Sequence, residues 1–187
     1  MRRHAALALC ALLLAGCSPA AREPDDLALV RVLGVDGGSP VVMAAVCARE
    51  GEEPAWSGWV EAESFEQARR ALPWSGGTEE LSLAGVSHLL VGPGVDLEKL
   101  LFAVLEDAEL GAASAVWATD QNCAVVLAVC TDPAADLELL TLQGVAAPTV
   151  AQAVAALVSE GEVTLPCLGV RAGRLEERGE RRWETEE

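Results

Sequence analysis

The sequence predicts an α+β fold, a mixed and largely antiparallel sheet with helices packed on it, in a single domain. Three observations support this prediction. The chain has 187 residues, which is enough for one ordinary domain. Apolar runs of strand-like composition alternate along it with amphipathic runs of helical spacing. The first two strand-like runs are separated by a short glycine turn, which predicts an opening hairpin.

The opening hairpin is predicted from two apolar runs and the turn between them. Residues 26–35 (DLALVRVLGV) predict a strand, and the glycines of Asp36-Gly37-Gly38 supply the positive φ that a tight turn needs. Residues 40–47 predict the second strand of the hairpin. After a charged loop, residues 56–60 predict a third, short strand.

Three helices are predicted from their capping signals and spacing. Ser64-Phe65-Glu66-Gln67 and Thr149-Val150-Ala151-Gln152 are capping-box patterns, and Asp96 precedes the most regular helical repeat. The side chains expected to face the core follow that repeat: Phe65, Ala68 and Leu72 in the first helix, Leu97, Leu100, Leu101, Val104 and Leu105 in the second, and Val150, Val154, Leu157 and Val158 in the third.

Apolar runs indicate the remaining strands. Residues 81–91 predict a strand buried on both faces, and residues 114–119 predict another. Residues 162–170 predict a further strand, in which Pro166 indicates an edge or a bend. Residues 122–130 (NCAVVLAVC) fit either a buried strand or a buried helix.

The charge balance limits the classes of partner. The chain has 13 Lys and Arg residues against 29 Asp and Glu, a formal net charge of −16. A nucleic-acid-binding protein replaces counterions with a basic face, so this composition excludes nucleic acid as the partner. An anionic membrane surface would repel the chain, so any attachment to a membrane must come from something other than charge.

The first segment predicts a lipoprotein signal peptide. A basic start is followed by a twelve-residue apolar run from Ala5 to Gly16, too short to span a bilayer. The run ends in Leu14-Ala15-Gly16-Cys17, the pattern of a bacterial lipobox, which makes Cys17 the predicted site of lipid attachment. Diacylglycerol with an added acyl chain such as palmitate would anchor the protein stably. Cleavage before Cys17 leaves 11 basic against 29 acidic residues, a net charge of −18.

These features divide the chain into four parts. Residues 1–16 form the predicted signal peptide and residues 17–25 a short tether. Residues 26–170 form the α+β domain. Residues 171–187 are mostly Arg and Glu, which predicts a charged tail in solvent.

Four cysteines remain in the mature chain besides Cys17: Cys47, Cys123, Cys130 and Cys167. All have apolar neighbours in sequence, and none forms a CxxC pair. Buried thiols that pack as small hydrophobes are one interpretation. One or two disulfides, formed outside the cytoplasm, are the other.

No residue pattern predicts catalysis, a metal site or a cofactor. His88 is the one histidine of the predicted mature chain and lies in an apolar strand, which favours a packed or hydrogen-bonded structural role. Gly92-Pro93-Gly94 lacks the further residues of a dinucleotide or P-loop motif and indicates a tight connection. The carboxylate pairs Glu52-Glu53 and Glu79-Glu80 fit a solvated surface. We therefore expect a non-enzymatic binding or assembly role.

The order of several segments resembles the N-terminal domain of the Ger(x)C family, the lipoprotein C subunit of bacterial spore germinant receptors. The resemblance begins at the lipobox and extends to about Val170. Glu106 stands where family members usually have Arg, and the family normally continues into a further C-terminal region that these 187 residues lack. The segments that support the resemblance are residues 25–36, residues 62–72, Ser87-His88-Leu89-Leu90-Val91-Gly92, the acidic stretch Glu106-Asp107-Ala108-Glu109 within residues 101–110, and Thr164-Leu165-Pro166.

This resemblance implies a non-enzymatic subunit held by lipid on the extracytoplasmic face of the cell membrane or inner spore membrane. Its partners would be two polytopic receptor subunits, of A and B type, that sense nutrients. A stand-alone solute-binding or sensing lipoprotein is the alternative, and it would need a sizeable pocket. The aromatic residues considered for a partner interface, with core packing as the alternative, are Trp56, Trp59 and Trp74.

Overall fold

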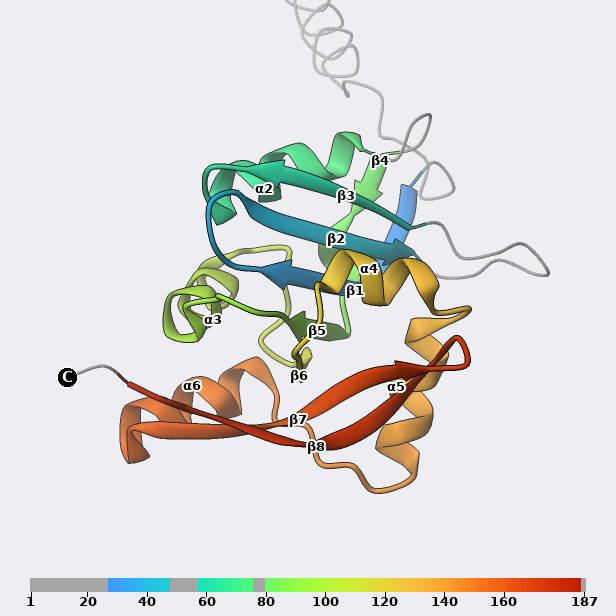
Figure 1. Cartoon of the computed structure of the whole chain (residues 1–187). Helices are drawn as coiled ribbons and strands as arrows, with labels where there is room; N and C mark the ends of the chain where they lie inside the picture. The colour runs from blue at the N-terminus through green and yellow to red at the C-terminus, as the bar shows by residue number, and fades with distance from the viewer. Residues whose placement is uncertain (1–26, 48–56, 76–79, 186–187) are drawn as a thin grey trace, which may run out of the picture.

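The computed structural model describes residues 27–47, 57–75 and 80–185, which form one domain (Figure 1). Within these ranges five helices pack on an eight-stranded mixed sheet, so the predicted fold class is confirmed. The strands are β1 (Leu27–Asp36), β2 (Val41–Cys47), β3 (Ser57–Ala62), β4 (Glu80–Ser82), β5 (His88–Val91), β6 (Ala115–Thr119), β7 (Glu162–Arg171) and β8 (Arg174–Glu184). The helices are α2 (Phe65–Ala71), α3 (Leu97–Glu106), α4 (Cys123–Val129), α5 (Pro133–Leu142) and α6 (Val150–Glu160).

The sheet has a parallel centre and antiparallel margins. Its main order is β3-β2-β1-β5-β6-β7-β8, and β4 pairs with the start of β1. The antiparallel ladders β1–β2, β2–β3 and β7–β8 are long, with six, six and ten paired positions. The parallel ladders β1–β4, β1–β5, β5–β6 and β6–β7 are short, with three, four, four and two. Most of the pairing is therefore antiparallel, as predicted.

The helices cover both faces of the sheet. Side chains of α2, α3 and α6 join one hydrophobic cluster, which includes Leu33 and Leu165. Side chains of α4 and α5 join a second cluster around Trp117 on the opposite face. Figure 1 shows α4 lying across β1 and β2, which it contacts. Alternate residues of the central strands thus face different helices, which explains why these strands are apolar on both faces.

The predicted hairpin and helix starts are confirmed. β1 and β2 pair in an antiparallel register from Val30–Cys47 to Asp36–Val42. The Ser64 hydroxyl accepts the Gln67 N–H at the start of α2. Asp96 caps α3 by accepting the Lys99 N–H. At α6 both bonds of a capping box form, between Thr149 and Gln152.

Two side chains expected to face inward do not. Leu105 of α3 is 40 % exposed and Val158 of α6 is 72 % exposed, so both predictions are wrong. Ala153 is fully buried on the inner face of α6 instead. The apolar stripe of each helix is therefore narrower than the helical repeat alone indicates.

The run at residues 81–91 is not one strand. It divides into β4, a 3₁₀ turn at Leu83–Gly85 and β5. β4 pairs with β1 at Leu27–Leu29 and β5 pairs further along it, so the turn carries the chain between the two stretches of pairing. Gly85 passes close to β1 there, since an added Cβ would lie 3.0 Å from the Val30 carbonyl oxygen.

The run at residues 122–130 is a helix, α4, capped by the Asn122 side chain on the Val125 N–H. The helix α5, for which no element was predicted, follows it. Asp132 caps α5 and Pro133 occupies its first turn, both of which are helix-start signals in the sequence.

The predicted charged tail is wrong over residues 174–184, which form β8. This strand pairs with β7 at ten positions, and its arginines bond to acidic side chains elsewhere: Arg174 to Asp136, Arg181 to Asp120 and Arg182 to Glu162. β8 lies at the edge of the sheet. Charged side chains are common on edge strands, because they prevent pairing with other chains, so the Arg- and Glu-rich composition of β8 is compatible with a strand.

The prediction for Pro166 agrees in part with the structure. β7 pairs with β6 only at Cys167 and Leu168, so Pro166 has no ladder partner on that side. The register against β8 also shifts between Cys167 and Leu168. A proline has no N–H to donate, and it is tolerated here because β6 does not pair with Pro166.

Candidate functional site

Some predicted site residues lie outside the described residues. These are Cys17, the predicted lipid attachment site, and Trp56, one of the tryptophans considered for an interface. Glu79 and the pair Glu52-Glu53, which the sequence assigns to a solvated surface, lie there too. The predicted signal peptide and tether lie there as well. Their assignments remain predictions from the sequence.

His88 is a buried structural residue, as predicted. Its side chain is 6 % exposed, and its Nδ1 accepts a hydrogen bond of 3.2 Å from the Trp117 indole Nε1 on the neighbouring strand β6. Burial lowers the pKa of His88 to about 4, so the ring is neutral at neutral pH. Its position within the sheet fits packing rather than proton transfer with a ligand.

The Gly92-Pro93-Gly94 segment is the tight connection that the sequence predicts. The Gly37 N–H donates to the Pro93 carbonyl at 2.9 Å, and the Gly92 N–H donates to the Val35 carbonyl at 2.8 Å. An added Cβ at Gly37 would lie 1.9 Å from the Gly94 carbonyl oxygen. The two glycine turns therefore pack directly against each other at the ends of β1 and β5.

A buried carboxylate beside these turns was not identified from the sequence. Asp36, 5 % exposed at the end of β1, accepts the Cys123 N–H with both carboxylate oxygens, each at 2.9 Å. This bond secures the first residue of α4. In the sequence, Asp36 is an acidic residue at the end of a predicted strand, and the predicted Asp36-Gly37-Gly38 turn is sufficient to account for it.

The cysteines fit the interpretation as buried thiols. All four are buried, and Cys123, Cys130 and Cys167 are free. Burial, together with nearby Asp136, raises the pKa of Cys130 to about 11. Burial and Asp36 raise the pKa of Cys123, and burial and Asp120 raise that of Cys167. These three thiols are therefore protonated at neutral pH and are weak nucleophiles.

The acidic stretch after α3 is tied to α2. Arg69 Nε lies 2.6 Å from Asp107 Oδ2, and Arg69 Nη2 lies 3.0 Å from Glu109 Oε2. Asp107 also accepts the backbone N–H groups of Glu109 and Leu110. The hydrogen bond from Arg69 lowers the pKa of Asp107, and Asp107 raises that of Arg69. Two segments of the chain that are 38 residues apart are thus joined by one ion-pair network.

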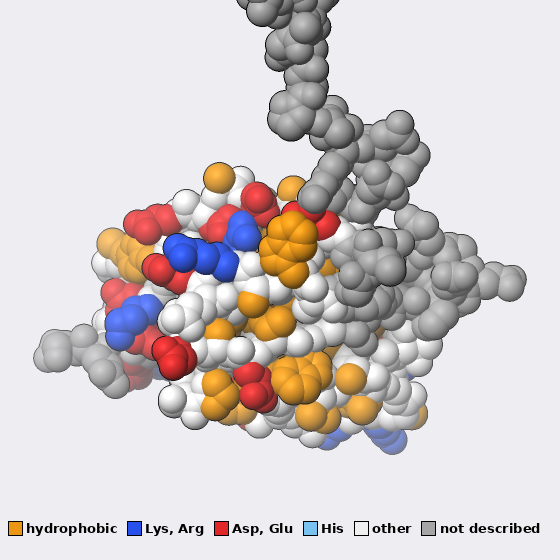
Figure 2. Space-filling model, turned by 90° about the horizontal axis from the view of Figure 1, so that it is seen from above, with side chains coloured by type: hydrophobic (Ala, Val, Ile, Leu, Met, Phe, Trp, Pro, Cys, Tyr) orange, Lys and Arg blue, Asp and Glu red, His pale blue; other side chains and the backbone are white. Residues whose placement is uncertain are grey.

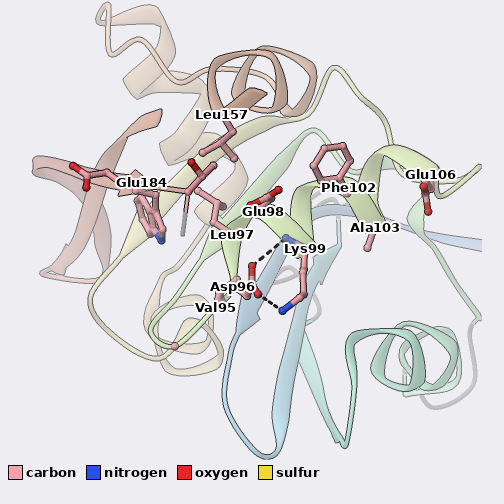
Figure 3. Close-up of a pocket in the computed structure, with 13 residues that line it drawn as sticks. Val95, Asp96, Leu97, Glu98, Lys99, Phe102, Ala103, Glu106, Leu157 and Glu184 are labelled. Carbon is pink, nitrogen blue, oxygen red and sulfur yellow. Dashed lines mark hydrogen bonds and ion pairs between the residues drawn. The ribbon is translucent and has the colours of Figure 1, made fainter. Parts of the chain in front are cut away.

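An open groove of about 780 Å³ lies on the surface between α3, α6 and the end of β8 (Figure 3). Its apolar wall includes Phe102, Leu157 and Trp183, and its acidic residues are Asp96, Glu98, Glu106 and Glu184. These residues come from three elements, α3, α6 and β8, whose packing against one another the sequence pattern does not predict.

Two of the tryptophans considered for an interface are exposed. Trp59 of β3 is 56 % exposed and Trp74, after α2, is 68 % exposed. Figure 2, viewed from the side of β3 and β4, shows apolar side chains among clusters of acidic and basic ones. Neither tryptophan is buried in the core.

No family model, no curated protein and no solved structure matches this chain. In the described part of the chain, no group of three or more His, Cys, Asp or Glu side chains is placed to hold a metal ion. The helices of that part are each too short or too polar to cross a membrane.

Proposed function

We propose that this chain is a non-enzymatic, membrane-anchored lipoprotein that serves as a C-type subunit of a spore germinant receptor. It supports the assembly or signalling of the A- and B-type polytopic subunits. The observation behind the proposal is the order of segments that follows the lipobox cysteine Cys17, because this order resembles that of the Ger(x)C N-terminal domain.

Contacts made by two of these segments support the proposal. The first segment ends in Asp36, which holds α4 through the Cys123 N–H. The segment at residues 62–72 contributes Arg69, which binds Asp107 and Glu109 of the acidic stretch. Residues that resemble family positions therefore act in holding the fold together, as expected for a scaffold.

The state of the reactive side chains also favours a binding role. His88 is neutral and engaged with Trp117, and the Cys130 thiol has a pKa of about 11. A general base or a nucleophile needs a pKa near the working pH and access to substrate. The pKa values of His88 and Cys130 lie away from neutral pH, and both side chains are buried.

Tethering explains how such a domain acts without chemistry of its own. Nine residues separate Cys17 from β1, and an extended chain of that length reaches about 30 Å. Lipid on Cys17 confines the domain within that reach of the bilayer. Confinement raises its effective concentration toward membrane partners without any new contact.

The anchor is tested by Cys17→Ser. We expect the wild-type protein in the membrane fraction of sporulating cells and the variant in the soluble fraction, since the thiol that accepts diacylglycerol is lost. Cys10→Ser is the matched control, because it changes a cysteine of the signal peptide that cleavage removes. A Cys17→Ser variant that stays in the membrane fraction would contradict the lipid anchor.

The receptor assignment is tested by affinity purification of the tagged lipoprotein from sporulating cells, with mass spectrometry of the proteins that accompany it. We expect A- and B-type germinant-receptor subunits. Their absence from the eluate, in spores that contain them, would contradict the assignment and favour a stand-alone solute-binding lipoprotein.

A further inference from the structure

The groove between α3, α6 and β8 combines apolar side chains with carboxylates. Phe102 of α3 is 37 % exposed, and Trp183 is partly exposed at the end of β8. Leu157 of α6 also lines the groove (Figure 3). The groove is open rather than enclosed, which suits a segment of another protein better than a small solute that must be surrounded.

The charges of the groove are unbalanced. Lys99 is the one basic residue among the described lining residues of the groove. Its Nζ lies 2.6 Å from Asp96 Oδ2, so the Asp96 carboxylate balances its charge. Glu184 is paired with Arg182 at 3.3 Å. The side chains of Glu98 and Glu106 form no hydrogen bond or ion pair with another described residue. Two carboxylates without an ion pair to a described residue therefore remain on α3, in a chain whose net charge is −16.

The spacing of these carboxylates restricts what could bind them. Glu98 and Glu106 are eight residues apart on α3, which is about 12 Å along the helix axis. Phe102 lies midway between them. An extended peptide places residues i and i+4 on one face about 13 Å apart, with residue i+2 on the same face between them. A Lys-x-Phe-x-Lys segment, or one with Leu at its centre, would match both charges and the aromatic side chain.

We propose that this groove docks an extended, basic segment of a protein partner, with one cation at Glu98, one at Glu106 and an apolar side chain against Phe102. The choice of a basic occupant rests on charge complementarity, and the acidic field of the whole chain steers such a segment toward the groove. The inference goes beyond the proposed function and holds for any partner protein, so it does not depend on receptor membership.

The test uses the purified full-length lipoprotein in detergent micelles and a fluorescent peptide, Ser-Lys-Ser-Phe-Ser-Lys-Ser, with blocked termini. Binding is measured by fluorescence anisotropy at low salt. The matched probe has both lysines replaced by glutamine. We expect the lysine peptide to bind at least tenfold more tightly than the glutamine peptide, and a rise in salt to reduce that difference.

Variants then locate the binding. Glu98→Gln with Glu106→Gln should remove most of the tenfold preference, and Phe102→Ser should weaken both peptides at least threefold. The matched control is Glu177→Gln with Glu180→Gln, which removes the same charge from the exposed part of β8 and should leave the preference within twofold.

Three outcomes would overturn the proposal. They are equal binding of the two peptides, a preference that survives loss of Glu98 and Glu106, and an equal reduction by the control variant, which would indicate nonspecific attraction to net charge. Circular dichroism of each variant separates these outcomes from misfolding. A negative result here leaves the receptor assignment intact, since that is decided by the proteins recovered with the tagged lipoprotein.

Discussion

Asp36 and Cys123 are 87 residues apart in sequence, yet the Asp36 carboxylate accepts the Cys123 backbone N–H with both oxygens at 2.9 Å. The bond joins the end of β1 to the first turn of α4. A helix start has N–H groups without partners inside the helix, and a carboxylate there also interacts favourably with the helix dipole. Asp36 is buried, so the Cys123 N–H that it accepts lies away from bulk water.

Asp36→Ala should therefore destabilise the fold by about 1–3 kcal/mol, since a buried N–H loses its acceptor. Asp36→Asn keeps one carbonyl oxygen as an acceptor and should cost less than half as much. Urea unfolding followed by circular dichroism measures both values. Equal stability of the alanine variant and the wild type would contradict the role assigned to this bond.

Gly92→Ala tests the close packing around the same carboxylate. An added Cβ at Gly92 would lie 1.8 Å from Asp36 Oδ1 and 2.9 Å from Cys123 Sγ. We expect a loss of about 2 kcal/mol or more, because a packed interior tolerates overfilling poorly. Gly111→Ala is the control, since its Cβ would meet its nearest atom at 3.6 Å. Similar unfolding midpoints for the two variants would show that the site relaxes without cost.

The sequence allowed the local features of the fold to be predicted, because they depend on near neighbours. The hairpin at Asp36-Gly37-Gly38 and the capping box at Thr149 were recognised from spacing alone. The division of residues 81–91 was not, because the interruption at Leu83–Gly85 depends on where β4 and β5 pair along β1. An apolar run indicates that its residues are buried, but it does not indicate which strand each residue pairs with.

Long-range pairs explain the other differences. Residues 174–184 have the composition of a solvated tail, and their pairing with β7 is visible only in three dimensions. The groove likewise depends on α3, α6 and Trp183 meeting. The contact of Asp36 with α4 was missed for the same reason. The pattern of a single sequence predicts which face of a helix or strand is buried. A site formed by three elements can be predicted only when the packing of those elements is known.

Arg69 and Asp107 should be coupled more strongly than an exposed ion pair. Their side chains are 19 % and 16 % exposed, against 37 % and 56 % for the pair Arg31–Glu138. A double-mutant cycle with Arg69→Met and Asp107→Asn should give a coupling energy of about 1–2 kcal/mol. The cycle with Arg31→Met and Glu138→Gln should give a coupling energy of about 0.5 kcal/mol or less. Equal coupling energies in the two cycles would contradict this ranking.

The same pair predicts a response to acid. Arg69 lowers the pKa of Asp107 in the folded chain. A carboxyl with a lowered folded-state pKa stabilises the protein above its unfolded pKa, near 3.9, and this stabilisation is lost as the pH falls through the folded-state pKa. Asp107→Asn should therefore lose less stability than the wild type between pH 5 and pH 3, as measured by urea unfolding. An identical loss would show that Asp107 keeps its ordinary pKa.

His88 predicts a separate response at higher pH. Burial lowers its pKa from the ordinary 6.5 to about 4, so the unfolded chain takes up a proton first as the pH falls. The stability from the neutral ring is complete above about pH 6.5 and is lost between there and about pH 4, by about 2 kcal/mol from pH 7 to pH 5. His88→Gln keeps an acceptor for Trp117 and does not titrate. Its unfolding free energy should therefore fall by about 2 kcal/mol less than that of the wild type over this range. Parallel curves for the two proteins would exclude His88 as the titrating group.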